Sequence, residues 1–116
     1  MTEAAKLFDV SGRTAVLTGG AGVLGTAMAG ALVARGASVA ILDLNGDAAA
    51  GCARELSAQG KAAGFAANVL ERASMEEATE AVLKEFGSID ILVNGAGGNR
   101  PDATTSAERS FFDQDV

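Results

Sequence analysis

The sequence predicts an α/β protein built on a parallel β-sheet. Short apolar runs typical of strands alternate with segments of helix length, giving four strands and three helices in turn. This βαβαβαβ order implies parallel strands joined by right-handed crossovers. A glycine follows each helical segment, at Gly36, Gly60 and Gly87, and glycine suits the left-handed conformation that ends a helix.

Four strands are expected from apolar runs bounded by turn residues. The third run is rich in alanine and glycine, which weakens its strand pattern. The predicted strands cover residues 13–17, 38–42, 62–67 and 89–93. After Asn94 the chain turns polar and irregular, and a further helix is expected around residues 106–116.

The three connecting helices differ in their pattern. The helix over residues 23–35 has few polar positions, which predicts burial on most of its sides. The helix over residues 46–59 is amphipathic, with an apolar face formed by Ala49, Cys52, Ala53 and Leu56. The helix over residues 74–86 is predicted to begin at a capping box at Ser74, and its apolar face comprises Met75, Ala78, Val82 and Phe86.

Composition excludes several classes of function. The 116 residues are 48% hydrophobic and 21% charged, with a net charge of −6, which suits one folded domain and not a nucleic-acid or anionic-membrane surface. One cysteine, Cys52, excludes an internal disulfide, and with no histidine a structural zinc site is excluded as well. The N-terminal residues lack the apolar core of a signal peptide, so a cytoplasmic location is expected.

A glycine-rich loop lies between the first strand and the first helix. Gly20, Gly22 and Gly25 follow the G-x-G-x-x-G spacing, and Gly19 precedes them. Such a loop turns tightly and lets the backbone approach a phosphate, while the helix N-terminus offers N–H groups and partial positive charge to an anion. The position between strand and helix favours phosphate binding over a purely structural turn.

Asp43 ends the second strand, where an acidic residue can hold the ribose hydroxyls of a dinucleotide. A carboxylate accepts hydrogen bonds from a 2′-hydroxyl but repels a 2′-phosphate, and neither the loop nor Leu44–Asn45 offers a basic residue. Asp43 therefore favours NAD over NADP. The alternative is that Asp43 or Asn45 simply caps the next helix.

Taken together, these motifs resemble the short-chain dehydrogenase/reductase family over nearly the whole chain. The resemblance rests on Thr18–Gly19 with Gly25, on Asp43, on Asn68–Val69 and on the run from Asn94 to Gly97. It implies a Rossmann-type three-layer αβα fold with strand order 3-2-1-4, in which residues 1–116 form an incomplete NAD(P)-binding domain, about the first half of such an enzyme. The cofactor-binding residues implied are Gly19, Gly22, Val23, Leu24, Gly25, Asp43, Asn68, Val69, Asn94, Gly95, Ala96 and Gly97.

The sequence departs from the family pattern in three places. Val23 stands where the family has its middle glycine, and Asn68 stands where the family has an aspartate. The family's Asn-Ala-Gly becomes Asn94-Gly95-Ala96-Gly97, which keeps the asparagine and the small residues after it. The amide oxygen of Asn68 can still accept a hydrogen bond from an adenine amino group, but without charge. The residues from Asn94 to Thr105 resemble one branch of the family, the fructuronate reductases or D-mannonate oxidoreductases, with Arg100 as a partner for a substrate carboxylate.

The family uses a catalytic serine and a Tyr-x-x-x-Lys motif. The chain contains no tyrosine, and the resemblance assigns no counterpart to the serine. These 116 residues are therefore expected to bind the dinucleotide but not to catalyse the reaction. The fourth strand, at the edge of the sheet, is expected to cause self-association. Two alternatives are a non-catalytic nucleotide-binding module and a methyltransferase that binds S-adenosylmethionine, although the Thr18–Gly19 opening and the run from Asn94 to Gly97 argue against the latter.

Overall fold

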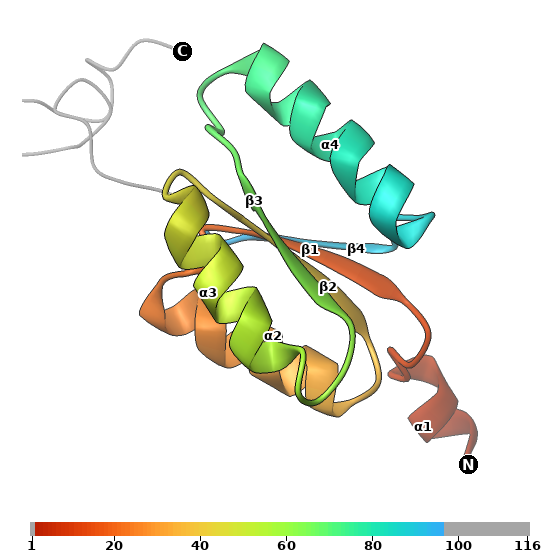
Figure 1. Ribbon diagram of the computed structural model, residues 1–116. Coiled ribbons are helices and arrows are strands. Elements are labelled where there is room, and N and C mark those ends of the chain that lie inside the picture. The colour runs from red at the N-terminus through yellow and green to blue at the C-terminus, as the bar shows by residue number, and fades with distance from the viewer. Residues whose placement is uncertain (1, 97–116) are drawn as a thin grey trace, which may run out of the picture.

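A computed structural model describes residues 2–96 (Figure 1). The expected helix around 106–116, together with Arg100 and Gly97, lies outside these residues. In chain order the elements are α1 Glu3–Leu7, β1 Thr14–Thr18, α2 Val23–Ala34, β2 Ser38–Asp43, α3 Gly46–Leu56, β3 Ala62–Ala66, α4 Arg72–Phe86 and β4 Ile91–Asn94. The short helix α1 was not anticipated from the sequence.

The four strands form one parallel sheet in the order β3-β2-β1-β4, which confirms the predicted topology. Thr18, the last residue of β1, lies opposite Leu42 of β2 and Asn94 of β4. The carboxyl ends of these three strands therefore meet at one edge of the sheet. In parallel α/β sheets this edge is where ligands bind.

Helices cover both faces of the sheet, as Figure 1 shows, with α2 and α3 on one face and α4 on the other. Side chains alternate along each strand, so that Leu17 and Ile41 pack toward α2 and α3 while Val16 and Leu42 pack toward α4. Strand β1 and the four central residues of β2 are buried, and both strands read as continuous apolar runs for this reason.

Helix α2 is less buried than its composition predicts. Only Gly25, Ala29 and Val33 are buried, at a spacing of four residues that defines one face. Val23 and Leu24, at the helix N-terminus, are 95% and 72% exposed. The prediction of burial on most sides was wrong because α2 belongs to an outer layer and contacts the sheet along a single stripe. The apolar faces predicted for α3 and α4 do pack against the sheet.

Several element ends differ from the prediction because side chains compete for backbone groups. Helix α4 begins at Arg72, with Glu71 at its N-cap, and not at Ser74. The Ser74 hydroxyl instead accepts a hydrogen bond of 2.9 Å from the backbone N–H of Asn68. Strand β4 begins at Ile91, directly after Asp90, whose carboxylate accepts the N–H of Thr14 at 2.9 Å and whose own N–H donates to the Thr14 carbonyl at 2.9 Å.

Two of the three predicted helix-ending glycines are confirmed. Gly36 and Gly87 have φ angles of +88° and +86°, in the left-handed region. Gly60 is different, since α3 already ends at Leu56 and the Ser57 hydroxyl donates to the Ala53 carbonyl at 2.8 Å. A side chain at Gly60 would start 3.0 Å from Val33 of α2, so close packing is the reason for glycine there.

Candidate functional site

A cleft of about 450 Å³ opens at the carboxyl edge of the sheet. It lies where the ends of β1, β2, β3 and β4 meet. Seven of the predicted site residues line it, namely Gly19, Gly22, Asp43, Asn68, Val69, Gly95 and Ala96. Segments that are distant in the sequence therefore contribute to one surface, as the family resemblance implies.

The glycine-rich loop is held tightly against the end of the sheet. Gly19 has a φ angle of +67°, and a side chain there would start 2.8 Å from the backbone of Ala96. A side chain at Gly25 would start 2.6 Å from the carbonyl oxygen of Gly19. These two glycines serve the fold directly, because no side chain fits at either position.

Gly22 is different, although it belongs to the same loop. It is the N-cap residue of α2, with φ −76° and ψ 174°, a conformation that any residue adopts. A side chain at Gly22 would meet only the Gly19 carbonyl oxygen, at 3.5 Å, which is an ordinary contact. Gly22 lines the cleft, so the missing side chain leaves space there.

The first turn of α2 lies beside this space. The N-terminal N–H groups of a helix have no partner within the helix and carry partial positive charge. No side chain caps the N-terminus of α2. Val23 and Leu24 belong to this turn but not to the cleft lining, and Gly25 is buried beneath the loop. The arrangement leaves backbone donors for an anion at the mouth of the cleft.

Asp43 joins the loop to the end of β2. One carboxylate oxygen accepts the N–H of Ala21 at 3.2 Å, and the other accepts the N–H of Asn45 at 3.0 Å. A carboxylate has about four acceptor positions, so both oxygens can accept further hydrogen bonds. The half-buried carboxylate therefore holds the loop and still offers acceptors to the cleft.

Asn45 is the residue that caps α3. Its side-chain oxygen accepts the N–H of Ala48 at 3.0 Å. The capping interpretation therefore applies to Asn45, while Asp43 is directed at Ala21 and the backbone of Asn45 itself. Asn45 therefore caps α3 and Asp43 does not, a choice that the sequence alone left open.

Asn68 and Val69 follow β3 and lie on the far wall of the cleft. The Asn68 amide oxygen accepts the N–H of Leu70 at 3.0 Å, and its amide nitrogen donates to the Glu71 carboxylate at 3.3 Å. Val69 is 45% exposed. This wall offers apolar surface together with one oriented amide.

The end of β4 forms the remaining side. The Thr18 hydroxyl, in a side chain that is almost fully buried, accepts the N–H of Ala96 at 3.3 Å, and the Thr18 carbonyl accepts the N–H of Gly95 at 3.0 Å. A side chain at Gly95 would start 2.8 Å from that carbonyl oxygen. Asn94 is exposed at the strand end and does not line the cleft.

Four further residues line the cleft that the motifs did not indicate: Leu42, Leu44, Ala67 and Leu70. Leu44 and Leu70 are 75% and 77% exposed, and both border the cleft. Their position directly after Asp43 and Val69 was the available signal. They give the cleft an apolar wall on which a flat ring can lie.

The electrostatics of the cleft come from Asp43 and the peptide dipoles. Among the residues described, no lysine or arginine lines the cleft. The same part of the chain, residues 2–96, contains no cluster of three or more His, Cys, Asp or Glu side chains that could hold a metal ion. No helix within that range is long and apolar enough to cross a membrane.

Comparison with known proteins identifies the relatives of this chain. Residues 13–115 match the short chain dehydrogenase family. An oxidoreductase of Bacillus subtilis, UxuB, whose function is uncharacterized, is 46% identical over 116 residues, a match that covers 92% of this chain and 42% of UxuB. The chain thus spans about two fifths of the length of this curated relative.

Solved structures share the fold and bind dinucleotides. A candidate D-mannonate oxidoreductase from Haemophilus influenza with bound NAD is 38% identical, with a TM-score of 0.76, over 97% of this chain and 44% of that one. The RhlG–NADP complex of Pseudomonas aeruginosa is 34% identical, with a TM-score of 0.73, over 78% of this chain and 37% of that one.

Proposed function

Because the chain belongs to the short chain dehydrogenase family, whose match covers residues 13–115, we propose that its cleft binds the adenosine half of NAD. The protein to which this cleft belongs is then an oxidoreductase that interconverts a carbonyl and an alcohol. A bound nicotinamide dinucleotide supplies or takes up the hydride of such a reaction.

The carboxylate of Asp43 is the observation that carries this proposal. It lies at the end of β2, keeps acceptor positions beyond its bonds to Ala21 and Asn45, and has no basic residue beside it in the described cleft lining. Ribose 2′- and 3′-hydroxyls can donate to it, whereas a 2′-phosphate would meet an uncompensated negative charge. We therefore propose that NAD is preferred over NADP.

The other cofactor residues follow from the same placement. The pyrophosphate would lie against the N-terminal turn of α2, at Gly22, Val23 and Leu24, where backbone donors and open space coincide. Gly19 and Gly25 shape this turn. The adenine ring would lie against Asn68 and Val69, beside Leu44 and Leu70. The run from Asn94 through Gly95 and Ala96 to Gly97 would continue the surface from β4.

The substrate class is proposed from the relatives. The NAD-bound structure that this chain resembles is that of a candidate D-mannonate oxidoreductase, in agreement with the branch indicated by the residues after Asn94. We propose a sugar acid as substrate. The chain has no tyrosine, so within these 116 residues no group serves as the family's proton donor, and binding without turnover is expected of them. A cytoplasmic location stays a prediction.

Calorimetric titration with NADH, NADPH and S-adenosylmethionine tests the proposal. NADH should bind, NADPH should bind more weakly, and S-adenosylmethionine should give no heat of binding. A preference for NADPH would refute the role of Asp43. Binding of S-adenosylmethionine in place of NADH would refute the oxidoreductase assignment, and binding of NADH without any activity of a protein that includes the rest of the fold would favour a non-catalytic module.

A further inference from the structure

We propose that Glu71 is a positioning residue that fixes the orientation of the Asn68 amide and thereby selects an adenine ring. The inference rests on the proposed dinucleotide function and adds a residue that no motif indicates. An amide carries a donor at one end and an acceptor at the other, so its orientation decides which group of a base it can pair with.

Two contacts of opposite kind fix this orientation. The backbone N–H of Leu70 can only donate, so the end of the Asn68 side chain that it meets at 3.0 Å must be the oxygen. The Glu71 carboxylate can only accept, so the end that it meets at 3.3 Å must be the nitrogen. Both contacts require the same rotamer of the amide.

The residues that line the cleft favour the oxygen as the end of the amide that a ligand meets. Leu70, whose N–H the oxygen accepts, lines the cleft together with Asn68, whereas Glu71 does not line it. The nitrogen is therefore directed outward to Glu71, and the oxygen, which can accept a second hydrogen bond, remains for a ligand. A hydrogen-bond donor on the ligand can bond to this oxygen, and an acceptor on the ligand is repelled by it.

Glu71 is free for this task because of its place in α4. It is the N-cap residue, yet its side chain makes no capping hydrogen bond to the helix. Its backbone N–H donates to the Asn68 carbonyl at 3.0 Å, and Ser74 accepts the Asn68 N–H at 2.9 Å. The turn from Asn68 to Glu71 is thus fastened at both ends, which holds the carboxylate beside the amide.

Adenine and hypoxanthine differ in the exocyclic group that would form a hydrogen bond with the Asn68 amide. Adenine carries an amino group, which donates, and hypoxanthine carries a carbonyl oxygen in its place, which accepts. The orientation fixed by Glu71 matches adenine. One neutral hydrogen bond gained or lost corresponds to a change in affinity of about two- to tenfold. The dissociation constants of the dinucleotides that carry these two bases should therefore differ by about tenfold.

The experiment compares NADH with reduced nicotinamide hypoxanthine dinucleotide by calorimetry, using the full 116-residue chain. The wild type should bind NADH about tenfold more tightly. Glu71→Ala removes the acceptor that holds the amide nitrogen, so this ratio should fall about threefold, mainly because the hypoxanthine form binds more tightly. Glu71→Gln can accept from that nitrogen but can also donate to the oxygen of a flipped amide, so it should lower the ratio as well, by no more than Glu71→Ala does.

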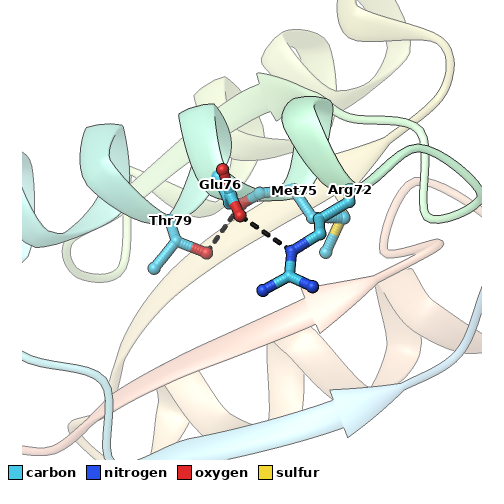
Figure 2. A network of polar contacts seen from close by, with 4 residues as sticks. All are labelled: Arg72, Met75, Glu76 and Thr79. Carbon is cyan, nitrogen blue, oxygen red and sulfur yellow. Dashed lines mark hydrogen bonds and ion pairs between the residues drawn. The ribbon is translucent and has the colours of Figure 1, made fainter.

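Glu76→Ala is the matched control, since it makes the same change of charge on the same helix. Figure 2 shows Glu76 directed toward Arg72, and their ion pair has a length of 2.9 Å. This variant should leave the ratio unchanged. Asn68→Asp gives a side chain that only accepts hydrogen bonds, so its orientation no longer matters. In the Asn68→Asp variant, Glu71→Ala should therefore leave the ratio of the two dissociation constants unchanged. If Glu71 had only a structural role, Glu71→Ala would have the same effect with Asn68 as with aspartate at that position.

The outcomes separate the two proposals. If the wild type binds neither dinucleotide, the proposed function fails and this inference fails with it. If the wild type binds NADH but Glu71→Ala leaves the base ratio unchanged, or changes it equally in both backgrounds, the proposed function stands and the role of Glu71 is refuted.

Discussion

Replacing Gly22 and Gly25 separately by alanine should separate the folding role of the glycine-rich loop from its binding role. The two glycines lie three residues apart, but their surroundings differ. An alanine Cβ at Gly25 would start 2.6 Å from the Gly19 carbonyl oxygen, whereas at Gly22 its nearest neighbour would be the same oxygen at 3.5 Å. Gly25→Ala must therefore displace backbone, and Gly22→Ala need not.

The expected effects on stability follow from these distances. Overpacking at Gly25 should cost about 1 to 3 kcal/mol of unfolding free energy, which lowers Tm by about 4 to 12 °C for a domain of this size. At Gly22, alanine is a poorer N-cap than glycine but reduces the entropy of the unfolded chain, and the two effects are of similar size. The net change in unfolding free energy should stay below about 1 kcal/mol.

Gly22→Ala should weaken the binding of NADH although it changes the unfolding free energy little. Its new methyl group would enter the space beside the first turn of α2, where the pyrophosphate is proposed to lie. A clash of about 1 to 3 kcal/mol weakens NADH binding about five- to hundredfold. Thermal unfolding followed by circular dichroism, and calorimetric titration with NADH, measure the two effects. A Gly22→Ala variant that binds NADH like the wild type would contradict the proposed place of the pyrophosphate beside Gly22.

Three further predictions concern other parts of the chain. Asp43→Ala should weaken NADH binding about tenfold or more, because charge-assisted hydrogen bonds are lost. The ratio between the affinities for NADH and NADPH should also become smaller, and calorimetry measures both effects. Asn45→Ala should remove the N-cap of α3 and lower the unfolding free energy by about 1 kcal/mol, measured by urea denaturation. Leu92, 59% exposed on β4, should promote self-association, so Leu92→Lys should shift size-exclusion profiles toward monomer; a monodisperse wild-type monomer would contradict this.

The parallel sheet could be predicted because it depends on patterns that span many residues, and the order of its strands because the motifs resemble a known family. Alternating strand and helix segments, with a glycine-rich loop after the first strand, specify a parallel sheet and locate its ligand edge. The structure accordingly brings Gly19, Asp43 and Asn68 to one cleft, although they lie far apart in the sequence.

Local features that depend on a single side chain could not be predicted. Ser74 has the sequence pattern of a helix N-cap, but its hydroxyl accepts the N–H of Asn68, so α4 begins earlier. Asp90, just before β4, accepts the N–H of Thr14 with its carboxylate, a position that a backbone carbonyl could otherwise fill. In each case a polar side chain competes with the backbone for one hydrogen bond, and the outcome depends on the tertiary fold.

The apolar wall of the cleft illustrates a second limit. Leu44 and Leu70 are exposed leucines that follow β2 and β3, and no motif marks them. Their common surface arises only when the two strands lie side by side. The same holds for Glu71, whose contact with Asn68 depends on where α4 begins.

A crystal structure of the chain with NAD would show whether the cleft holds the dinucleotide as proposed. The ribose hydroxyls should donate to Asp43, the pyrophosphate should contact the N–H groups at the start of α2, and the adenine ring should lie beside Asn68. A cleft that remains empty at saturating NAD, or a dinucleotide bound without contact to Asp43, would contradict the proposal.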